Sequence, residues 1–441
     1  MAGGLSQLVA YGAQDVYLTG NPQITFFKTV YRRYTNFAIE SIQQTINGSV
    51  GYGNKVSTQI SRNGDLITDI VVEFVLTKDA AGANTTFYPA EQLLQDVELE
   101  IGGQRIDKHY NDWFRTYDSL FRMNNDRVNY RRMTDFVDGE NTQTGVSYAT
   151  KRFYVPLIFF FNQTPGLALP LIALQYHEVK LYFTLASQVN GLNVTFYGAT
   201  PVASSTPQMS VWVDYIFLDT QERTRFAQLP HEYLIEQLQF TGTETATPSA
   251  TSMASQNIRL NLNHPTKYLA WNFNNPASTC YGQYTALANT SVNYSPLGDL
   301  SNTATYNEGL AVLDSAKLQL NGQDRFSTRK GSYFNKVQPF QTIGSVVPAG
   351  VYLYSFALKP AGRQPSGTCN FSRIDNATLS LTYKQCSVNG TDTIANVTTN
   401  LYTSETATSN TAVVLTALNI YAKNYNVLRI MSGMGGLAYA S

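Results

Sequence analysis

The chain has 441 residues, which is enough for two or three domains of ordinary size, and only 14% of its residues are charged. Its 31 basic and 31 acidic residues cancel, so no net field attracts nucleic acid or an anionic membrane surface. Low charge also lets many copies pack together with little repulsion, which favours an assembling protein.

The first residues show no targeting signal. Met1–Leu5 has no basic region and no long apolar core, and Ala2 stands where myristoylation needs glycine. The longest apolar run, Tyr154 to Phe161, is too short to cross a bilayer. We therefore expect synthesis and folding in the cytosol.

Residues 1 to about 25 are rich in glycine and include Pro22, so we expect an arm outside the folded domains. The next segment, Thr25–Phe37, interleaves aromatic residues with Lys28, Arg32 and Arg33. Such a mixture suits stacking on nucleic acid, and it also suits a buried protein interface. Because the net charge is zero, the interface interpretation is favoured.

Runs of β-branched and aromatic residues, bounded by turn residues, predict eight strands in the first half of the chain. The predicted strands are Phe37–Ile46, Lys55–Ile60, Leu66–Thr77, Val97–Ile101, Phe153–Phe161, Leu167–Leu174, Val179–Leu185 and Met209–Leu218. Aromatic residues from Trp113 to Phe121 recur at helical spacing and predict a short helix within a long connection from Asp107 to Lys151. The polar residues after Leu218 predict a linker.

The second half restarts the strand pattern at Tyr233–Thr241. Further strands are predicted at Asn257–Leu262, Lys267–Phe273, Leu313–Leu320, Val351–Leu358, Cys369–Arg373, Ala377–Tyr383 and Ala412–Leu428. Two connections, Asn274–Glu308 and Ser387–Thr411, are long and rich in Thr, Ser and Asn. Because successive antiparallel strands alternate in direction, both connections are expected to leave the domain from the same end and to face solvent.

Short echoes about 200 residues apart indicate an internal duplication. They pair Leu99–Arg105 with Leu318–Arg325, Ile39–Gln43 with Ile235–Gln239, Glu178–Phe183 with Asn376–Leu381, and Trp212–Tyr215 with Tyr421–Tyr425. Two tandem, eight-stranded antiparallel units fit an all-β fold of two jelly rolls with short helices in loops. The predicted boundaries are an arm at 1–25, a first roll at 26–218, a linker at 219–232, and a second roll at 233–441 that includes a C-terminal tail.

The residues give no argument for catalysis or for a metal or cofactor site. Cysteines 280, 369 and 386 are too scattered for a disulfide framework or a zinc site, and we expect reduced thiols. The four histidines lack ligand partners at useful spacing: His109, His177, His231 and His264. Glu98 and Glu100 alternate on one strand face, as a glycosidase needs, but solvated strand faces commonly carry such pairs.

Three long motifs stand out: Asp15–Lys28 with Tyr31–Thr35, the junction Leu218–Arg223 through Leu234–Glu236, and Asn424–Ile430. These motifs resemble those of the double jelly-roll major capsid proteins of nucleocytoplasmic large DNA viruses, and they are most similar to the chlorovirus members. The resemblance implies a structural protein of the virion, not an enzyme. It implies a homotrimer that forms a pseudo-hexagonal capsomer and contacts neighbouring capsomers and minor capsid proteins beneath an icosahedral shell. It implies no direct contact with nucleic acid and no transmembrane segment.

The resemblance also implies covalent glycans, with no other cofactor, at asparagines in an Asn-Thr-X-Thr-like context. Asn302 fits that context best, and Asn289 and Asn396 are candidates by their position in the long loops. Asn400 and Asn410 share that position but depart from the pattern, since Asn400 lacks the following threonine and the segment after Asn410 has valine at the last place.

Two other functions stay open at this point. A carbohydrate- or receptor-binding jelly roll of the particle surface shares the fold class. A jelly-roll hydrolase or lyase needs acids that converge in one cleft, and its candidates are Glu98, Glu100, Asp107 and Asp112.

Overall fold

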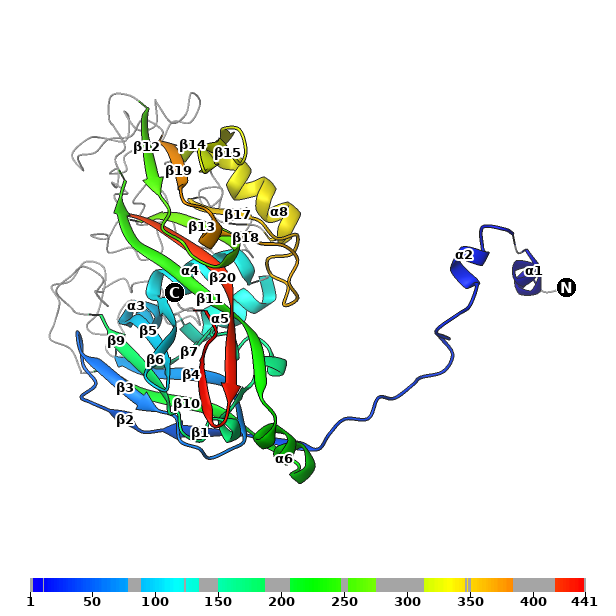
Figure 1. The fold of residues 1–441 in the computed structure, drawn as a ribbon, viewed down its shortest axis with the longest axis horizontal. Helices are drawn as coiled ribbons and strands as arrows, with labels where there is room; N and C mark the ends of the chain where they lie inside the picture. Colours follow the sequence, from blue (N-terminus) through cyan, green and yellow to red (C-terminus); the bar gives the residue numbers. More distant parts are fainter. Residues whose placement is uncertain are drawn as a thin grey trace. The chain divides into compact units, whose positions relative to one another are not determined.

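A computed structural model describes residues 3–10, 12–77, 89–122, 124–134, 150–186, 207–246, 253–274, 313–345, 347, 350–383 and 417–439. The chain divides into two compact units, residues 1–37 and 38–441. The first unit contains the short helices α1 (Gly3–Val9) and α2 (Val16–Thr19), followed by chain without regular structure up to the first strand (Figure 1).

The second unit begins with a jelly roll of two antiparallel sheets. One sheet has the order β1-β10-β4-β7 and the other has the order β2-β3-β9-β5-β6. The first sheet comprises β1 (Phe37–Gln44), β10 (Gln208–Leu218), β4 (Leu66–Thr77) and β7 (Thr150–Pro156). The second comprises β2 (Ile46–Asn47), β3 (Lys55–Gln59), β9 (Val179–Leu185), β5 (Leu94–Ile101) and β6 (Gln104–Tyr110).

A second jelly roll repeats this arrangement, with sheets β11-β20-β13-β17 and β12-β19-β14-β15. The first of these sheets comprises β11 (His231–Thr245), β20 (Ala417–Met431), β13 (Pro265–Asn274) and β17 (Val351–Ser355). The second comprises β12 (Ala254–Arg259), β19 (Ala377–Tyr383), β14 (Leu313–Leu320) and β15 (Gln323–Asp324). The four sequence echoes fall on strands in matching positions, so the predicted double jelly roll is confirmed.

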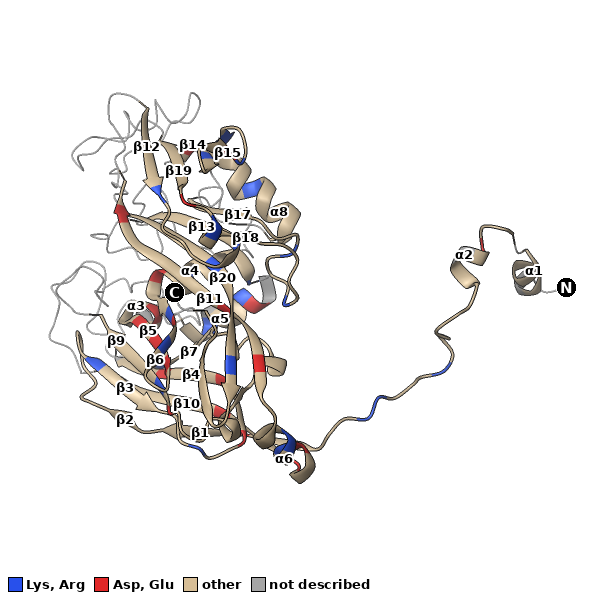
Figure 2. Cartoon of the chain, in the orientation of Figure 1, with Lys and Arg blue, Asp and Glu red and all other residues tan. Residues whose placement is uncertain are grey.

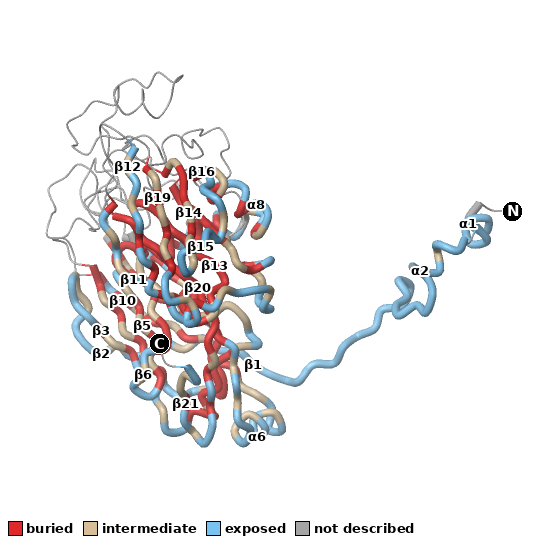
Figure 3. Tube along the Cα trace, turned by 45° about the horizontal axis from the view of Figure 1, so that its top comes forward, coloured by how far each residue is buried: buried red, intermediate tan, exposed pale blue. Residues whose placement is uncertain are grey.

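Period-two alternation produces these sheets. In both β9 and β19 every second side chain is buried, and the others are half-buried on the outer face. Figure 3 shows the buried residues concentrated between the sheets of each roll. One large core contains Phe74, Phe153 and Phe183 of the first roll, and a second contains Trp271, Leu318 and Leu381 of the second roll. Charges of both signs are interspersed over the second unit (Figure 2).

Several predicted strands are wrong or too long because local turns interrupt them. Leu167–Leu174 contains two 3₁₀ turns, η1 (Pro165–Leu167) and η2 (Leu171–Ala173), around the two-residue β8 (Leu169–Pro170). Pro170 has no N–H to extend a ladder. The predicted Phe153–Phe161 strand ends at Pro156, and a turn follows in which the Phe159 amide donates to Asn162 Oδ1 at 3.0 Å.

The second roll shows the same effect. Cys369–Arg373 is strand only in β18 (Cys369–Asn370), because the Asn370 side chain accepts from the Ser372 amide at 3.0 Å and starts the 3₁₀ turn η6 (Phe371–Arg373). The predicted Val351–Leu358 strand ends at Ser355.

Elements that were not predicted from the sequence include α1, α2, β6, α5 (Asn124–Thr134), α6 (Thr220–Gln228) and β21 (Met434–Leu437). Strand β6 follows the Gly102-Gly103 turn, whose φ angles of 58° and 83° favour glycine, so the long connection begins at Asn111 and not at Asp107. Helix α6 lies in the segment predicted as a linker.

Candidate functional site at the joint between the rolls

Each roll carries a helical insert between corresponding strands. The first insert, residues 111–134, follows β6 and contains α4 (Asn111–Phe121) and α5. The second insert, residues 329–342, precedes β17 and contains β16 (Arg329–Lys330), the π-helix η5 (Tyr333–Val337) and α8 (Gln338–Thr342). The first insert lies between the rolls, whereas α8 lies on the second roll away from the first (Figure 1).

Helix α4 forms where the helical spacing from Trp113 to Phe121 predicts a helix, and it packs two aromatic side chains of that stretch on the second roll. The Trp113 ring lies 5.2 Å from that of Tyr421, and the Phe121 ring lies 5.0 Å from that of Tyr268. Trp113 is fully buried. These contacts join the first insert to the outward face of the second roll's β11-β20-β13-β17 sheet.

A buried carboxylate, Asp112, fixes this contact. Its Oδ2 accepts from Asn272 Nδ2 at 2.7 Å, from Asn419 Nδ2 at 3.1 Å and from the Tyr421 hydroxyl at 2.9 Å. Asn272 Nδ2 also donates to Thr116 Oγ1 at 2.7 Å. An ionised carboxylate is tolerated in a protein interior only where donors satisfy it, so the three donors from β13 and β20 bind the two rolls together.

A second polar contact lies on β6. Asp107 Oδ1 accepts from the Leu238 amide of the second roll at 2.9 Å, and Asp107 Oδ2 lies 3.1 Å from His109 Nε2. Burial opposes ionisation of Asp107, but His109, Lys423 and the Leu238 amide outweigh it and hold its pKa below the ordinary value. Burial also lowers the pKa of His109, against the pull of Asp107.

A cluster of buried charges joins α4 to α5 within the insert. Arg115 Nη1 lies 2.9 Å from Asp118 Oδ2, and Arg127 Nη2 donates to the Asp118 and Ser119 carbonyls at 2.9 Å. Glu91, on α3 (Pro89–Leu93), is fully buried beside these groups. Burial raises the pKa of Glu91 to about 7. Glu91 therefore keeps its proton to a higher pH than an exposed glutamate does.

The C-terminal hairpin β20–β21 makes a further attachment to the first roll. The Tyr176 amide donates to the Gly433 carbonyl at 2.9 Å, and the Leu437 amide donates to Gln104 Oε1 at 3.1 Å. His177 Nδ1 lies 2.9 Å from the Gly435 carbonyl oxygen. A Cβ atom on Gly435 would lie 2.7 Å from Leu174 Cδ2, so the hairpin fits closely on the first roll. Two separate attachments fix the angle between the rolls.

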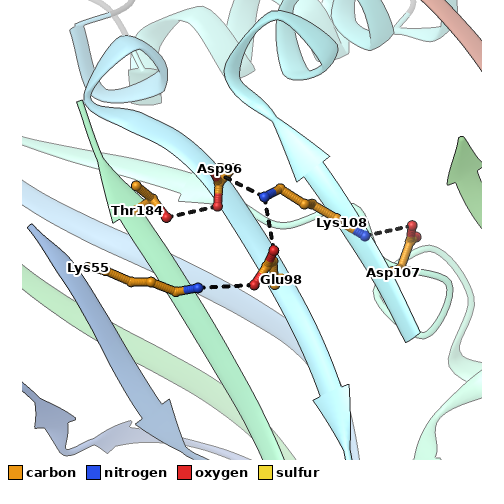
Figure 4. Close-up of polar contacts among 6 residues, drawn as sticks. All are labelled: Lys55, Asp96, Glu98, Asp107, Lys108 and Thr184. Atoms are coloured by element: carbon orange, nitrogen blue, oxygen red, sulfur yellow. Dashed lines mark hydrogen bonds and ion pairs between the residues drawn. The ribbon is translucent and has the colours of Figure 1, made fainter. Parts of the chain in front are cut away.

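The acids proposed for a hydrolase do not converge. Figure 4 shows Glu98 on the sheet surface, bonded to Lys55 at 3.2 Å and to Lys108 at 2.9 Å, with Asp96 accepting from Thr184. Burial raises the pKa of Glu98, but these two lysines outweigh it and bring the pKa below its ordinary value. Asp107 and Asp112 are buried in the separate contacts described above, and Glu100 lies on the surface of β5. The arrangement is that of a solvated strand face and two structural carboxylates.

The histidines serve structural contacts. His231 Nε2 lies 2.8 Å from the Phe226 carbonyl oxygen, and His264 stands at a turn with a φ of 65°. Within the described part of the chain, no group of three His, Cys, Asp or Glu side chains is placed to hold a metal ion. A surface hollow of about 600 Å³ lies among Tyr176, Leu229 and Met431, without acids in its lining.

The predicted glycosylation sites lie outside the described residues: Asn289, Asn302, Asn396, Asn400 and Asn410. The strand ends that border their loops are described. Asn274 pairs with Ala417, and Leu313 pairs with Tyr383, so both loops start and finish at one end of the second roll.

No sequence signal indicated the joint between the rolls, because the residues that bond to Asp112 come from strands far away along the chain.

Comparisons with known proteins bear on the whole chain. The family model for the major capsid protein N-terminus matches residues 25–219, and that for the large eukaryotic DNA virus major capsid protein matches residues 222–436. Over the full length of both chains, the sequence is 80% identical to the major capsid protein of Paramecium bursaria Chlorella virus 1 and 43% identical to that of Pyramimonas orientalis virus.

The fold matches solved capsid structures. A chain of the PBCV-1 virus capsid superimposes with a TM-score of 0.82 at 77% identity, covering 95% of this chain and 100% of that chain. The Faustovirus major capsid protein, at 14% identity, superimposes with a TM-score of 0.66 over 97% of this chain and 96% of that chain, which shows the shared fold.

Proposed function

The chain belongs to the major capsid proteins of large eukaryotic DNA viruses, and from that premise we propose that it builds the viral shell as a homotrimer. It is a structural component of the virion, and the carbohydrate- or receptor-binding alternative is not favoured. The observation that carries the trimer is the pair of rolls with the same strand order, joined by buried contacts into one block. Three such blocks supply six similar rolls, which is what a pseudo-hexagonal capsomer requires.

Sedimentation tests the trimer. The purified chain at micromolar concentration should sediment with three times its monomer mass of 48.9 kDa. Obligate interfaces commonly bury about 2,000–5,000 Å². Because the chain has zero net charge, electrostatic repulsion between copies opposes the burial of such an area only weakly. Monomer mass at that concentration would contradict the proposal.

The arm is proposed to contact neighbouring capsomers or minor capsid proteins beneath the shell. Taken by itself, the first unit exposes Phe26, Phe27 and Tyr31, by 88%, 97% and 87%, next to the basic residues Arg32 and Arg33. Exposed aromatic and arginine side chains are the residues that protein interfaces prefer. Among the described residues, no helix is long and apolar enough to cross a membrane. Synthesis in the host cytoplasm and the lack of direct contact with nucleic acid belong to the same proposal.

Covalent glycans are proposed on the end of the second roll where its two long loops begin and end. Asn289 and Asn302 are the first candidates, and Asn396, Asn400 and Asn410 are the others. A surface with so little charge gains solubility from hydrated sugar. Peptide mass mapping of virion-derived protein should find modified Asn289 and Asn302 peptides, and unmodified peptides at both positions would refute the assignment.

A further inference from the structure

The surface hollow near Tyr176 lies at the end of the rolls opposite the two long loops. Strand β20 runs from Ala417, beside those loops, to Met431, which lines the hollow. Figure 3 shows α6 and β21 together at this end of the second unit, away from β12. The lining comes from the first roll before β9, from the end of α6 and from the turn after β20. Both rolls and the helix that connects them therefore build the hollow.

The hollow is uncharged, and its rim is apolar. Its lining contains no acid, lysine, arginine or histidine. Tyr176, Leu229 and Met431 on the rim are 75%, 50% and 51% exposed. A smaller hollow of about 300 Å³ shares Tyr176 with it, so the depression continues past that ring. Exposed apolar side chains gathered at one place favour a contact with another protein segment.

The first helix of the arm is uncharged as well. No residue from Met1 to Gln14 carries a charge. Leu5, Leu8 and Val9 of α1 are three and four residues apart, so they share one side of the helix, and they are 57%, 79% and 81% exposed. Isolated helices shorter than about 12 residues are marginal in water. With seven residues, α1 needs a surface on which its apolar side can pack.

The arm joins the first roll at the end where the hollow lies. Gln43, near the end of β1, donates to Ser210, near the start of β10, at 3.2 Å. The two strands therefore run in opposite directions, and β1 begins where β10 leads into α6. Residues 20–36, between α2 and β1, form no helix or strand. At about 3.3 Å per residue they span up to about 55 Å, which is enough to reach a neighbouring copy.

We propose that the hollow binds α1 of a copy in a neighbouring capsomer. Both surfaces are uncharged, so their contact buries no charge without a partner. Residues 1–37 form a compact unit apart from the rolls, which leaves the arm available to a second copy. Each copy has one arm and one hollow, so the contact can repeat from capsomer to capsomer. This inference rests on the proposed trimer and names the surface that receives its arm.

The substitution Leu8→Asp tests the contact, because it places a carboxylate on the apolar side of α1. Purified wild-type trimers should associate further as their concentration rises, and the variant should need a concentration roughly tenfold higher or more. Gln7→Asp is the matched control, since residue 7 is exposed on the opposite side of the same helix, and it should associate like the wild type. Both variants should keep the trimer mass and the wild-type circular dichroism.

A change on the other side of the contact should have the same effect. Leu229→Asp puts a carboxylate on the rim of the hollow, at a side chain that is half exposed in the free chain. Its trimers should lose further association as those of Leu8→Asp do. Sedimentation over a range of concentrations measures both variants.

Crosslinking between two populations shows whether the contact joins different copies. Trimers of Leu8→Cys are mixed with trimers of Met431→Cys and treated with a short bismaleimide. The mixture should give a covalent dimer of chains above the background that the native cysteines produce. Each variant alone should give only that background, because neither population then has both members of the pair.

The outcomes separate this inference from the trimer itself. A wild-type chain of monomer mass overturns both. If the wild type is a trimer, absence of the mixed crosslink, or wild-type association of Leu8→Asp, overturns the docking and leaves the trimer standing. An arm that binds a different protein, or its own chain, gives that result. The mixed crosslink together with weakened association of Leu8→Asp supports both.

Discussion

At the scale of single residues, Asp112 accepts three hydrogen bonds across the joint. The substitution Asp112→Ala removes the acceptor shared by Asn272, Asn419 and Tyr421 and leaves buried donors without a partner. Loss of one member of such a buried network costs about 3–5 kcal/mol. We expect a clear fall in the free energy of unfolding, measured by urea denaturation.

Asp126 supplies the matched control. It lies in the first turn of α5 in the same insert, but it is exposed. Asp126→Ala should change the free energy of unfolding by no more than about 0.5 kcal/mol. Equal effects of the two substitutions would show that Asp112 does not hold the joint.

Glu91 gives the molecule a pH dependence of known sign. Its pKa is raised from 4.5 to about 7, so the folded chain keeps the proton between these values while the unfolded chain loses it. Stability from this group is therefore full below about pH 4.5 and is lost as the pH rises toward 7. Glu91→Gln imitates the protonated form, and its free energy of unfolding should fall less than that of the wild type between pH 5 and about 8.

One control variant isolates this effect from the other titrating groups. Glu100→Gln changes a carboxyl on the sheet surface and should keep the wild-type pH profile. His109 acts in the opposite sense, since its pKa is lowered and its contribution is lost as the pH falls below 6.5. Parallel profiles for the wild type and Glu91→Gln across this range would contradict the assignment.

At the scale of elements, the C-terminal hairpin is expected to act as a strap on the first roll. Gly435→Val places side-chain atoms where buried Leu174 already lies, and overpacking of this kind costs about 1–3 kcal/mol. We expect a lower thermal midpoint and faster proteolysis at the hairpin. Gly166→Val is the control, because a Cβ atom there would make only an ordinary contact, at 3.7 Å from Thr164 Cγ2. A wild-type midpoint for Gly435→Val would exclude the strap.

The elements that the sequence predicts well are those whose signal is local. Leu66–Thr77, Val179–Leu185, Leu313–Leu320 and Ala377–Tyr383 are strands with the predicted bounds, because alternation along one strand is enough to define them. Leu167–Leu174 fails because its apolar residues fill the core from 3₁₀ turns and not from a strand. Burial alone does not distinguish these two conformations.

At the scale of the whole molecule, the arm is expected to be separable from the rolls. Residues 1–37 form a compact unit of their own, so deletion of residues 2–22 should leave the thermal midpoint and the trimer mass unchanged. Incorporation into virions should fall sharply, measured by the share of the variant among capsid protein in purified particles. A lowered midpoint would place the arm in the core, and normal incorporation would remove its role in assembly.

The sequence by itself determined the repeated fold and the family, because alternation, turn residues and the motifs from Asp15 to Lys28 are written along the chain. Only the tertiary structure decided how the rolls are joined. Asp112 lies 160 residues from Asn272 and 309 residues from Tyr421 along the chain. At such separations, no local sequence pattern shows which polar residues form hydrogen bonds with each other.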